Sequence, residues 1–231
     1  MKFIESWKSR FITWGWKQHL DYDVETIPMP VPLIHSIISK YKKLRGNTEL
    51  TQIYYIGRDP NPFVYWLYPC TQPKGLIKYR NQKNDFLDGL SKNILDKLVY
   101  RPAPLNPVSL EDGPRIEKRY SGINIDKNGV IHQELFKSRV VVCDTPGTTF
   151  HICMGANIPV IGVWDFDDYP VVPQTKELLD SIVKAGIVFS SHKEAAKFID
   201  ENYNNIDQWW SSDLIQMARR DWSDRNARTK S

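Results

Sequence analysis

The amino-acid sequence predicts an α/β fold, a doubly wound domain built on a mostly parallel sheet. Apolar segments of strand length alternate with amphipathic segments of helix length, which is the pattern of a parallel sheet covered by helices. Residues 139–143 and 158–163 are apolar on both faces, as strands buried on both sides must be. The 231-residue chain is also long enough to bury a sizeable apolar core.

The first predicted elements are short. Alternating residues predict a strand over 10–16, and the proline-rich run 27–32 is expected to be an extended linker. Apolar residues at helical spacing then predict a helix over 33–45 that ends at Gly46. A buried strand is expected to follow over 51–57.

The middle of the chain is predicted to contain two loops, one helix and one strand. Residues 58–77 are rich in proline and aromatic residues, which indicates a loop. Apolar residues on one face predict a helix over 78–98 that runs directly into a strand over 98–104. Residues 105–120 show no periodicity, so we expect a second long loop there.

The second half has the most regular pattern. It predicts a helix over 129–138, a strand over 139–144, a turn over 145–149 that opens a helix to about Ala156, and a strand over 158–164. It then predicts a helix over 175–185 ended by Gly186, a strand over 187–189, a helix that Ser191 and Glu194 cap, and one or two helices over 206–225.

The net charge of +4 does not indicate a nucleic-acid-binding protein. Most of the excess lies near the end of the chain, in Arg219, Arg220, Arg225, Arg228 and Lys230, opposed by Asp221 and Asp224. A solvated terminal helix explains such a segment, whereas a polyanion-binding protein needs a basic face on its folded body. We therefore expect no nucleic-acid partner.

The three cysteines, Cys70, Cys143 and Cys153, cannot pair evenly and are too few and too widely spaced for a zinc site. Two of them stand in apolar stretches, where a thiol behaves as a small buried side chain. The sequence contains neither a signal peptide nor an apolar run long enough to cross a membrane. We therefore expect a reducing, cytoplasmic compartment and no transmembrane segment.

Ligands of doubly wound sheets bind beyond the carboxyl ends of the strands, and three segments lie at such positions. They are Gly57-Arg58-Asp59, the turn that begins at Arg101, and Asp144-Thr-Pro-Gly-Thr-Thr149.

The turn at 144–149 is the most informative of the three. Gly147 permits a tight turn, and Thr148 or Thr149 can cap the next helix, whose first amides and dipole favour a phosphate. The guanidinium of Arg101, at the mouth of a neighbouring strand, suits the same ligand, and Arg58 is a further candidate for substrate binding. The alternatives are a capped turn without a ligand and an Arg101 that only pairs with a surface carboxylate.

Other candidates have ordinary alternatives. Asp165, Asp167 and Asp168 could hold a divalent ion, although an acidic loop is the simpler explanation. Trp164 offers a flat face for a base or a sugar, or is simply packed. His132 and His151 are expected to be ordinary helix residues. The sequence has no Walker A, GxGxxG, GxSxG or HExxH motif, so hydrolase, dehydrogenase and zincin readings find no support.

The segment CDTPGTTFHICMGANIPVIGVW (143–164) resembles the carboxyl-terminal half of a transferase family that accompanies surface-carbohydrate biosynthesis genes and is similar to GT-B glycosyltransferases. The resemblance continues through Ala185-Gly-Ile187, the helix at 194–199 and the Trp-Trp pair at 209–210. Residues 10–17 are similar to a segment in the middle of that family's longer chains.

This resemblance implies a Rossmann-like, GT-B-type domain that binds a nucleotide sugar and works with an amino-terminal acceptor domain or a partner chain. Gly147, Thr148 and Thr149 would contact the donor phosphate, and Arg101 matches a basic residue of the family. Helix amides and a basic side chain would balance the leaving-group charge, so no metal or other cofactor is implied. We identify no catalytic base in the sequence.

Two residues depart from the pattern of related chains, which carry a glutamate at position 152 and a histidine at position 103. This chain has Ile152 and Ala103 there. Donor binding can survive both changes, whereas catalysis need not. A catalytically inactive remnant or partner subunit therefore stays an alternative, as does an epimerase-like or metal-using enzyme.

The predicted organisation has three parts. Residues 1–31 form an aromatic and proline-rich segment, 32–205 the nucleotide-sugar-binding domain, and 206–231 the terminal helices and basic tail. The first part carries the aromatic residues Phe3, Trp7, Phe11, Trp14 and Trp16, a surface that we expect another domain or subunit to cover. At roughly 100–200 residues per domain, the chain is short for an enzyme with two full domains.

Overall fold

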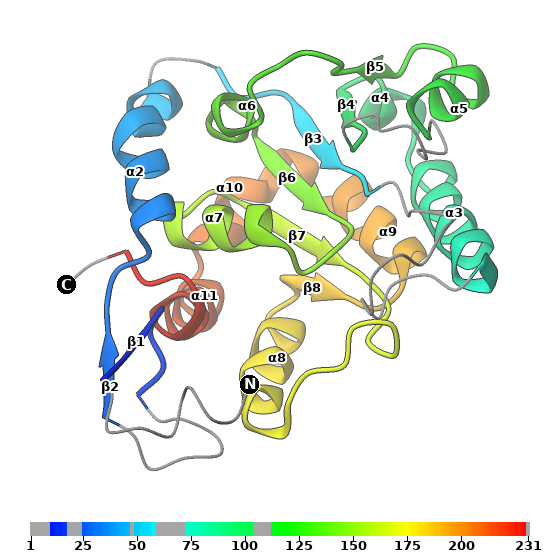
Figure 1. Ribbon diagram of the computed structural model, residues 1–231. Coiled ribbons are helices and arrows are strands. Elements are labelled where there is room, and N and C mark those ends of the chain that lie inside the picture. Colours follow the sequence, from blue (N-terminus) through cyan, green and yellow to red (C-terminus); the bar gives the residue numbers. More distant parts are fainter. Residues whose placement is uncertain (1–9, 18–24, 47–48, 59–72, 104–111, 230–231) are drawn as a thin grey trace.

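The computed structural model describes residues 10–17, 25–46, 49–58, 73–103 and 112–229 (Figure 1). Its centre is a parallel sheet of six strands in the order β5-β4-β3-β6-β7-β8. The strands are β3 (Ile53–Ile56), β4 (Leu98–Arg101), β5 (Asn124–Ile125), β6 (Val140–Cys143), β7 (Val160–Val163) and β8 (Val188–Phe189). When these six strands are numbered by their order in the chain, they lie across the sheet as 3-2-1-4-5-6. This is the doubly wound order of nucleotide-binding sheets. The predicted α/β class is confirmed.

Helices cover both faces of the sheet because the strand residues alternate between two apolar clusters. Tyr54 and Val141 belong to the cluster on one face, whereas Tyr55 and Val142 belong to the other. The helices of the first face are α2 (Pro32–Tyr41), α6 (Ile131–Lys137), α7 (Thr148–Ala156), α8 (Pro173–Lys184) and α11 (Asp213–Asn226). Those of the second face are α3 (Pro73–Asp88), α4 (Lys92–Leu95), α5 (Asp112–Arg119) and α9 (His192–Asn202), while α10 (Ile206–Ser211) contributes to both clusters.

Most predicted elements of the second half are found within two or three residues of their predicted bounds. A 3₁₀ turn (Lys42–Gly46) extends helix α2 to Gly46, the residue at which the sequence predicted that the helix would end. The amide of Glu194 donates to Ser191 Oγ at 3.3 Å, which confirms the predicted cap of α9. The final segment is a pair of helices, α10 and α11.

The first strand is shorter than predicted, and the expected linker is partly a strand. β1 (Phe11–Thr13) pairs in parallel with β2 (Thr26–Pro28) as a separate two-stranded sheet. Pro28 is tolerated at the end of an edge strand because no ladder hydrogen bond needs its nitrogen there. This small sheet lies beside the end of α11 (Figure 1), where the amide of Arg228 donates to the carbonyl of Trp14.

The prediction of one helix over 78–98 was wrong. Helix α3 begins at Pro73 and ends at Asp88, and a short turn separates it from α4. Gly89 explains the break, because a Cβ there would lie 2.9 Å from the Cβ of Ala196 on α9. The absence of a side chain lets the end of α3 approach α9 closely.

The expected loop over 105–120 contains helix α5, and β5 was also missed. Ile116 is the only large apolar residue in the sequence DGPRIEKR, so α5 has almost no apolar periodicity to detect. β5 has only two residues. Residues 59–72 and 104–111, which make up much of the two predicted loops, lie outside the described residues.

Cys143 and Cys153 are buried and free, as their apolar surroundings predicted. Cys70, Phe3, Trp7 and Lys230 lie outside the described residues. Among the helices that are described, none is both long enough and apolar enough to span a membrane.

Candidate functional site

The candidate site lies where the order of the strands reverses. β3 pairs with β4 on one side and with β6 on the other. The chain forms β4 and β5 on the first side before it crosses to form β6 on the second. Ligands of doubly wound sheets bind in the crevice beyond the carboxyl ends of the two strands at such a point. The segments at this position are Gly57-Arg58 after β3 and Asp144–Gly147 after β6.

The turn after β6 presents the N-terminus of α7 to this crevice. Gly147 occupies the N-cap position with extended backbone, and no side chain caps the helix. The expected cap by Thr148 or Thr149 is therefore not found, because both residues lie inside the helix. Thr148 is exposed and Thr149 half-buried. The first-turn amides of an α-helix have no acceptor within the helix, and the dipole adds a partial positive charge.

His151 occupies the same first turn. Its Nδ1 lies 3.0 Å from the carbonyl oxygen of Gly147, so this nitrogen donates. Burial lowers the pKa of His151, and the bond to the carbonyl opposes that shift. A neutral, hydrogen-bonded His151 agrees with the prediction of an ordinary helix residue. His132 is a residue of α6, and burial lowers its pKa too.

Arg58 reaches across the carboxyl end of β6. Its Nη1 donates to the hydroxyl of Tyr169, in the loop after β7, at 2.6 Å. Because β6 lies between β3 and β7 in the sheet, this hydrogen bond spans the carboxyl end of β6, where the turn before α7 begins. A cationic group and a helix N-terminus thus lie at the same edge of the sheet, at the switch point.

Buried side chains form hydrogen bonds with the backbone of Arg58. Its amide donates to the hydroxyl of Tyr79 at 2.8 Å and to Asp144 Oδ2 at 3.3 Å. Its carbonyl accepts from Lys83 Nζ at 3.2 Å. These bonds fix the point from which the guanidinium extends.

Lys83 and two aspartates form the centre of this support, which we call the buried ionic cluster (Lys83, Asp112 and Asp144). Lys83 Nζ lies 2.5 Å from Asp112 Oδ2 and 3.8 Å from Asp144 Oδ2, and all three side chains are at most 1% exposed. Nζ also donates to the hydroxyl of Tyr100 at 2.8 Å.

Desolvation acts differently on the two aspartates. Burial raises the pKa of Asp112, but Lys83, Tyr100 and Arg115 outweigh burial and hold it at about 2. Burial also raises the pKa of Asp144, and here the opposing effect of Lys83 and Tyr79 is too small to reverse the direction. Oδ2 of Asp144 receives all of its hydrogen bonds, whereas Oδ1 is buried without a partner among the described residues. Burial raises the pKa of Tyr79 and Tyr100 well above the ordinary value, so both hydroxyls stay protonated donors.

The sequence indicated Arg58 and Asp144 as candidates but gave no prediction for Lys83, Tyr79 and Asp112, which the structure places beside them. A signal for Lys83 was present, because it precedes Phe86, Leu87 and Leu90 at the spacing of one helix face. A lysine in line with an apolar face is a candidate for a buried cation. Asp112 gave no signal, since its helix was not predicted.

Arg101 lies at the end of β4 but is bound elsewhere. Its Nη1 lies 3.2 Å from Asp126 Oδ1 and donates to the carbonyl of Gly129 at 3.0 Å. These partners belong to the loop between β5 and α6. The structure therefore favours the alternative in which Arg101 pairs with a carboxylate.

Trp164 is 3% exposed, and its ring meets Phe150 edge-on at a centroid distance of 5.3 Å. It is packed in the core and does not present a free face. Ile152 is also buried, at 1% exposure, and Ala103 is half-buried.

The acidic loop after β7 is engaged by Lys78, which lies 2.5 Å from Asp165 and 3.3 Å from Asp168. Across the described ranges, no group of three histidine, cysteine, aspartate or glutamate side chains is arranged to hold a metal ion. The ion pairs of Lys78 with Asp165 and Asp168 favour the explanation of an ordinary acidic loop.

Comparisons with known proteins complete the description. The sequence model of a family described as LIC12162 family transferase matches residues 1–231. No curated protein sequence matches the chain.

Several solved structures are similar to the chain. The wall teichoic acid polymerase TagF, in a structure soaked with CDPG, has 11% identity and a TM-score of 0.50, over 89% of this chain and 48% of its own. WaaG, a glycosyltransferase involved in lipopolysaccharide biosynthesis, has 12% identity and a TM-score of 0.46, over 93% and 62%. The spinosyn forosaminyltransferase SpnP has 14% identity and a TM-score of 0.46, over 91% and 50%. At these identities the similarity concerns the fold, and this chain spans between 48% and 62% of the length of these proteins.

Proposed function

The chain belongs to the LIC12162 family of transferases and has the fold of GT-B glycosyltransferases, and from this premise we propose that it binds the nucleotide-sugar donor of a glycosyl transfer reaction. The observation that carries the proposal is the convergence of the Arg58 guanidinium and the uncapped N-terminus of α7 at the switch point of the sheet. We place the reaction in surface polysaccharide biosynthesis, in the cytoplasm.

In this proposal the donor phosphate lies at the first turn of α7. The amides of Thr148 and Thr149 donate to it, and Gly147 at the N-cap adds no side chain between the ligand and the backbone. Arg58 supplies a full positive charge from the opposite strand. These groups are fixed before the sugar–phosphate bond breaks, so they stabilise the charge that develops on the leaving nucleotide.

The other predicted site residues have supporting roles in this scheme. Asp144 does not touch a phosphate, since a buried carboxylate would repel it, but holds the Arg58 amide in place. Arg101 fixes the loop after β5 through Asp126, and Trp164 supports the first turn of α7 through Phe150.

We assign the acceptor side to a separate domain or partner chain. The proposed division is a partner-facing segment at 1–31, the donor domain at 32–205 and the terminal helices and tail at 206–231. Ile12 and Trp14 in the first part are 65% and 58% exposed, which supports a surface meant to be covered. We expect the base that deprotonates the acceptor hydroxyl to come from that partner.

Titration with UDP-, CMP- and GDP-sugars, followed by calorimetry and by thermal unfolding, tests the proposal. One nucleotide class is expected to bind and to raise the unfolding temperature by mass action. Arg58→Ala is expected to weaken binding about 10- to 100-fold, since a charge-assisted contact contributes roughly 1.5–3 kcal/mol.

Two arginine variants serve as controls. Arg101→Ala and Arg119→Ala remove guanidinium groups that pair with Asp126 and Asp88, and both are expected to bind the nucleotide as the unchanged protein does. The proposal fails if no nucleotide binds, or if Arg58→Ala binds as tightly as the unchanged chain.

One observation favours a second candidate, a donor-binding subunit without catalysis of its own. Ile152 stands where related chains carry a glutamate, and its side chain is part of the apolar core. Under this candidate, nucleotide sugar binds but is not turned over even when the acceptor-side partner is present, which separates it from the first.

A further inference from the structure

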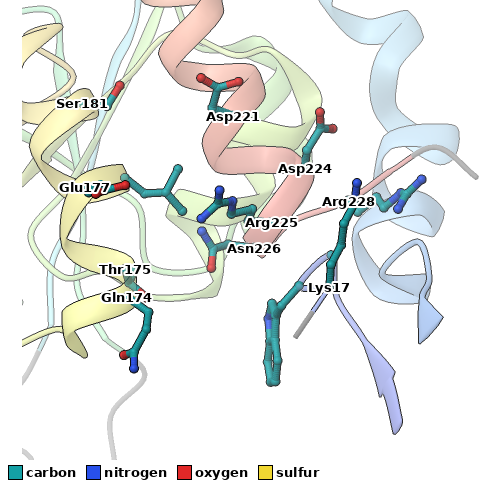
Figure 2. A pocket seen from close by; sticks show the side chains of 13 residues that line it. Lys17, Gln174, Thr175, Glu177, Ser181, Asp221, Asp224, Arg225, Asn226 and Arg228 are labelled. Atoms are coloured by element: carbon teal, nitrogen blue, oxygen red, sulfur yellow. The ribbon is translucent and has the colours of Figure 1, made fainter. Parts of the chain in front are cut away.

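A pocket of about 1120 Å³ lies between α8, the end of α11 and the residues that follow β1 (Figure 2). It is separate from the crevice of the candidate site. Its volume slightly exceeds the range of about 300–1,000 Å³ for small-molecule pockets. Figure 2 shows Gln174, Thr175 and Glu177 of α8 on one side, Lys17 on the other, and Arg225 and Asn226 of α11 between them.

The wall formed by residues 15–17 is fixed against α11. Gly15 has a φ of 146°, and a Cβ there would lie 2.0 Å from the carbonyl oxygen of Asp224, so only glycine permits this contact. The hydroxyl of Thr13 donates to the carbonyl of Trp16 at 2.6 Å. The ring of Trp16 packs against Phe11 at a centroid distance of 6.1 Å and is still 40% exposed at the pocket. The indole is therefore held in place with one part open to a ligand.

The charges of the lining cancel. Lys17, Arg225 and Arg228 oppose Glu177, Asp221 and Asp224. Apart from Arg228, these six side chains make no hydrogen bond or ion pair with another described residue. The pocket therefore offers donors and acceptors in similar number, together with the amides of Gln174 and Asn226 and the hydroxyls of Thr175 and Ser181.

This lining selects among ligand classes. Phosphate or a polyanion would meet three carboxylates, and an apolar ligand would desolvate the charged groups of Lys17, Arg225, Glu177, Asp221 and Asp224 without giving them a partner. A carbohydrate has hydroxyl groups that both donate and accept, so it can satisfy carboxylates, cations and amides at once. The apolar face of a sugar ring packs on an indole, whose own N–H stays available.

We propose that this pocket binds a neutral carbohydrate, with Trp16 as the surface on which a sugar ring stacks and Asn226 and Arg225 as hydrogen-bonding partners. Binding at this pocket does not depend on the function proposed above, which assigns the acceptor to a separate domain or partner chain.

Saturation-transfer NMR of the full chain, without nucleotide, tests the proposal with glucose, galactose, N-acetylglucosamine and their linear tetrasaccharides. At least one sugar is expected to bind. Trp16→Ala and Asn226→Ala are each expected to weaken binding about tenfold. Trp14→Ala is the matched control, since this tryptophan is 58% exposed, lies two residues away and does not line the pocket.

Absence of binding by every sugar tested would overturn the proposal, and so would unchanged binding by Trp16→Ala. Arg58→Ala separates this proposal from that for the donor site, because the variant is expected to lose nucleotide binding and to keep sugar binding. If sugar binds and no nucleotide does, the pocket assignment stands and the donor proposal fails.

Discussion

Lys83 ties three segments of the candidate site together. Its ammonium group reaches the carbonyl of Arg58 after β3, the hydroxyl of Tyr100 on β4 and the carboxylate of Asp112 on α5. Burial of a cation is costly, and the cost is offset only where its donors and counter-charge are all satisfied, as they are here. The result is a fixed anchor for Arg58 rather than a large gain in stability.

His192 gives the fold a pH dependence that can be measured. It is 5% exposed at the start of α9, and burial lowers its pKa to about 4, an effect that Asp85 only partly opposes. In the unfolded chain a histidine titrates near pH 6.5. Between these values the unfolded chain binds a proton that the folded one does not, so the free energy of unfolding falls as the pH falls from about 6.5 to about 4, by roughly 3 kcal/mol.

Urea unfolding at several pH values checks this expectation. His192→Gln is expected to reduce the dependence in that window, to which His132 and His151 also contribute because burial lowers their pKa, and to leave a further loss below about pH 4. The second loss comes from Asp112, whose carboxylate keeps a pKa of about 2 when folded and an ordinary value near 4 when unfolded. Equal slopes for His192→Gln and the unchanged chain between pH 6.5 and 4 would contradict the assignment.

At the scale of elements, the contact between α3 and α9 depends on two small residues. Gly89 faces Ala196 so closely that a Cβ would have to move a neighbouring atom. Gly89→Ala is therefore expected to destabilise the fold by about 1–3 kcal/mol through overpacking. Ala196→Gly in the same chain removes the opposing methyl group and is expected to recover part of the loss.

A double-mutant cycle in urea measures this coupling. Gly46→Ala is the control, because a Cβ there would meet nothing within 4 Å. Additive effects of Gly89→Ala and Ala196→Gly would show that the two residues are not in contact in the way the structure indicates.

How well each element could be predicted depended on its contact with the core. β6 and β7 consist of residues buried on both faces, so their apolar runs were visible in the sequence. Helix α5 contributes Ile116 and little else to the core, and its polar sequence hid it. The turn before α7 was identifiable because strand, glycine and helix follow one another within a few residues. The buried ionic cluster was not, since its three members come from segments that only the folded sheet brings together.

At the scale of the whole molecule, backbone hydrogen bonds join the two ends of the described chain. Arg228 donates its amide to the carbonyl of Trp14 at 3.2 Å and accepts from the amide of Val31 at 2.8 Å. Ala227, one residue earlier, is fully buried against the core. Gly15, which follows β1, also packs against the backbone of Asp224 and Arg225, so the position of the small sheet depends on the end of α11 and the short segment after it.

Removal of residues 227–231 is therefore expected to release β1 and β2 while the six-stranded sheet stays folded. Hydrogen exchange of the backbone amides should then rise by orders of magnitude at 11–13 and 26–31, because local opening no longer breaks contacts with the domain. Amides of β3, β6 and β7 are expected to keep most of their protection, since their hydrogen bonds and their burial do not involve the removed residues. A chain that lacks only Lys230 and Ser231 is the control and should exchange as the full chain does, because it keeps both hydrogen bonds of Arg228. Unchanged protection of β1 and β2 in the shorter chain would show that another contact holds the amino-terminal segment, and loss of protection throughout would show that the two units unfold together.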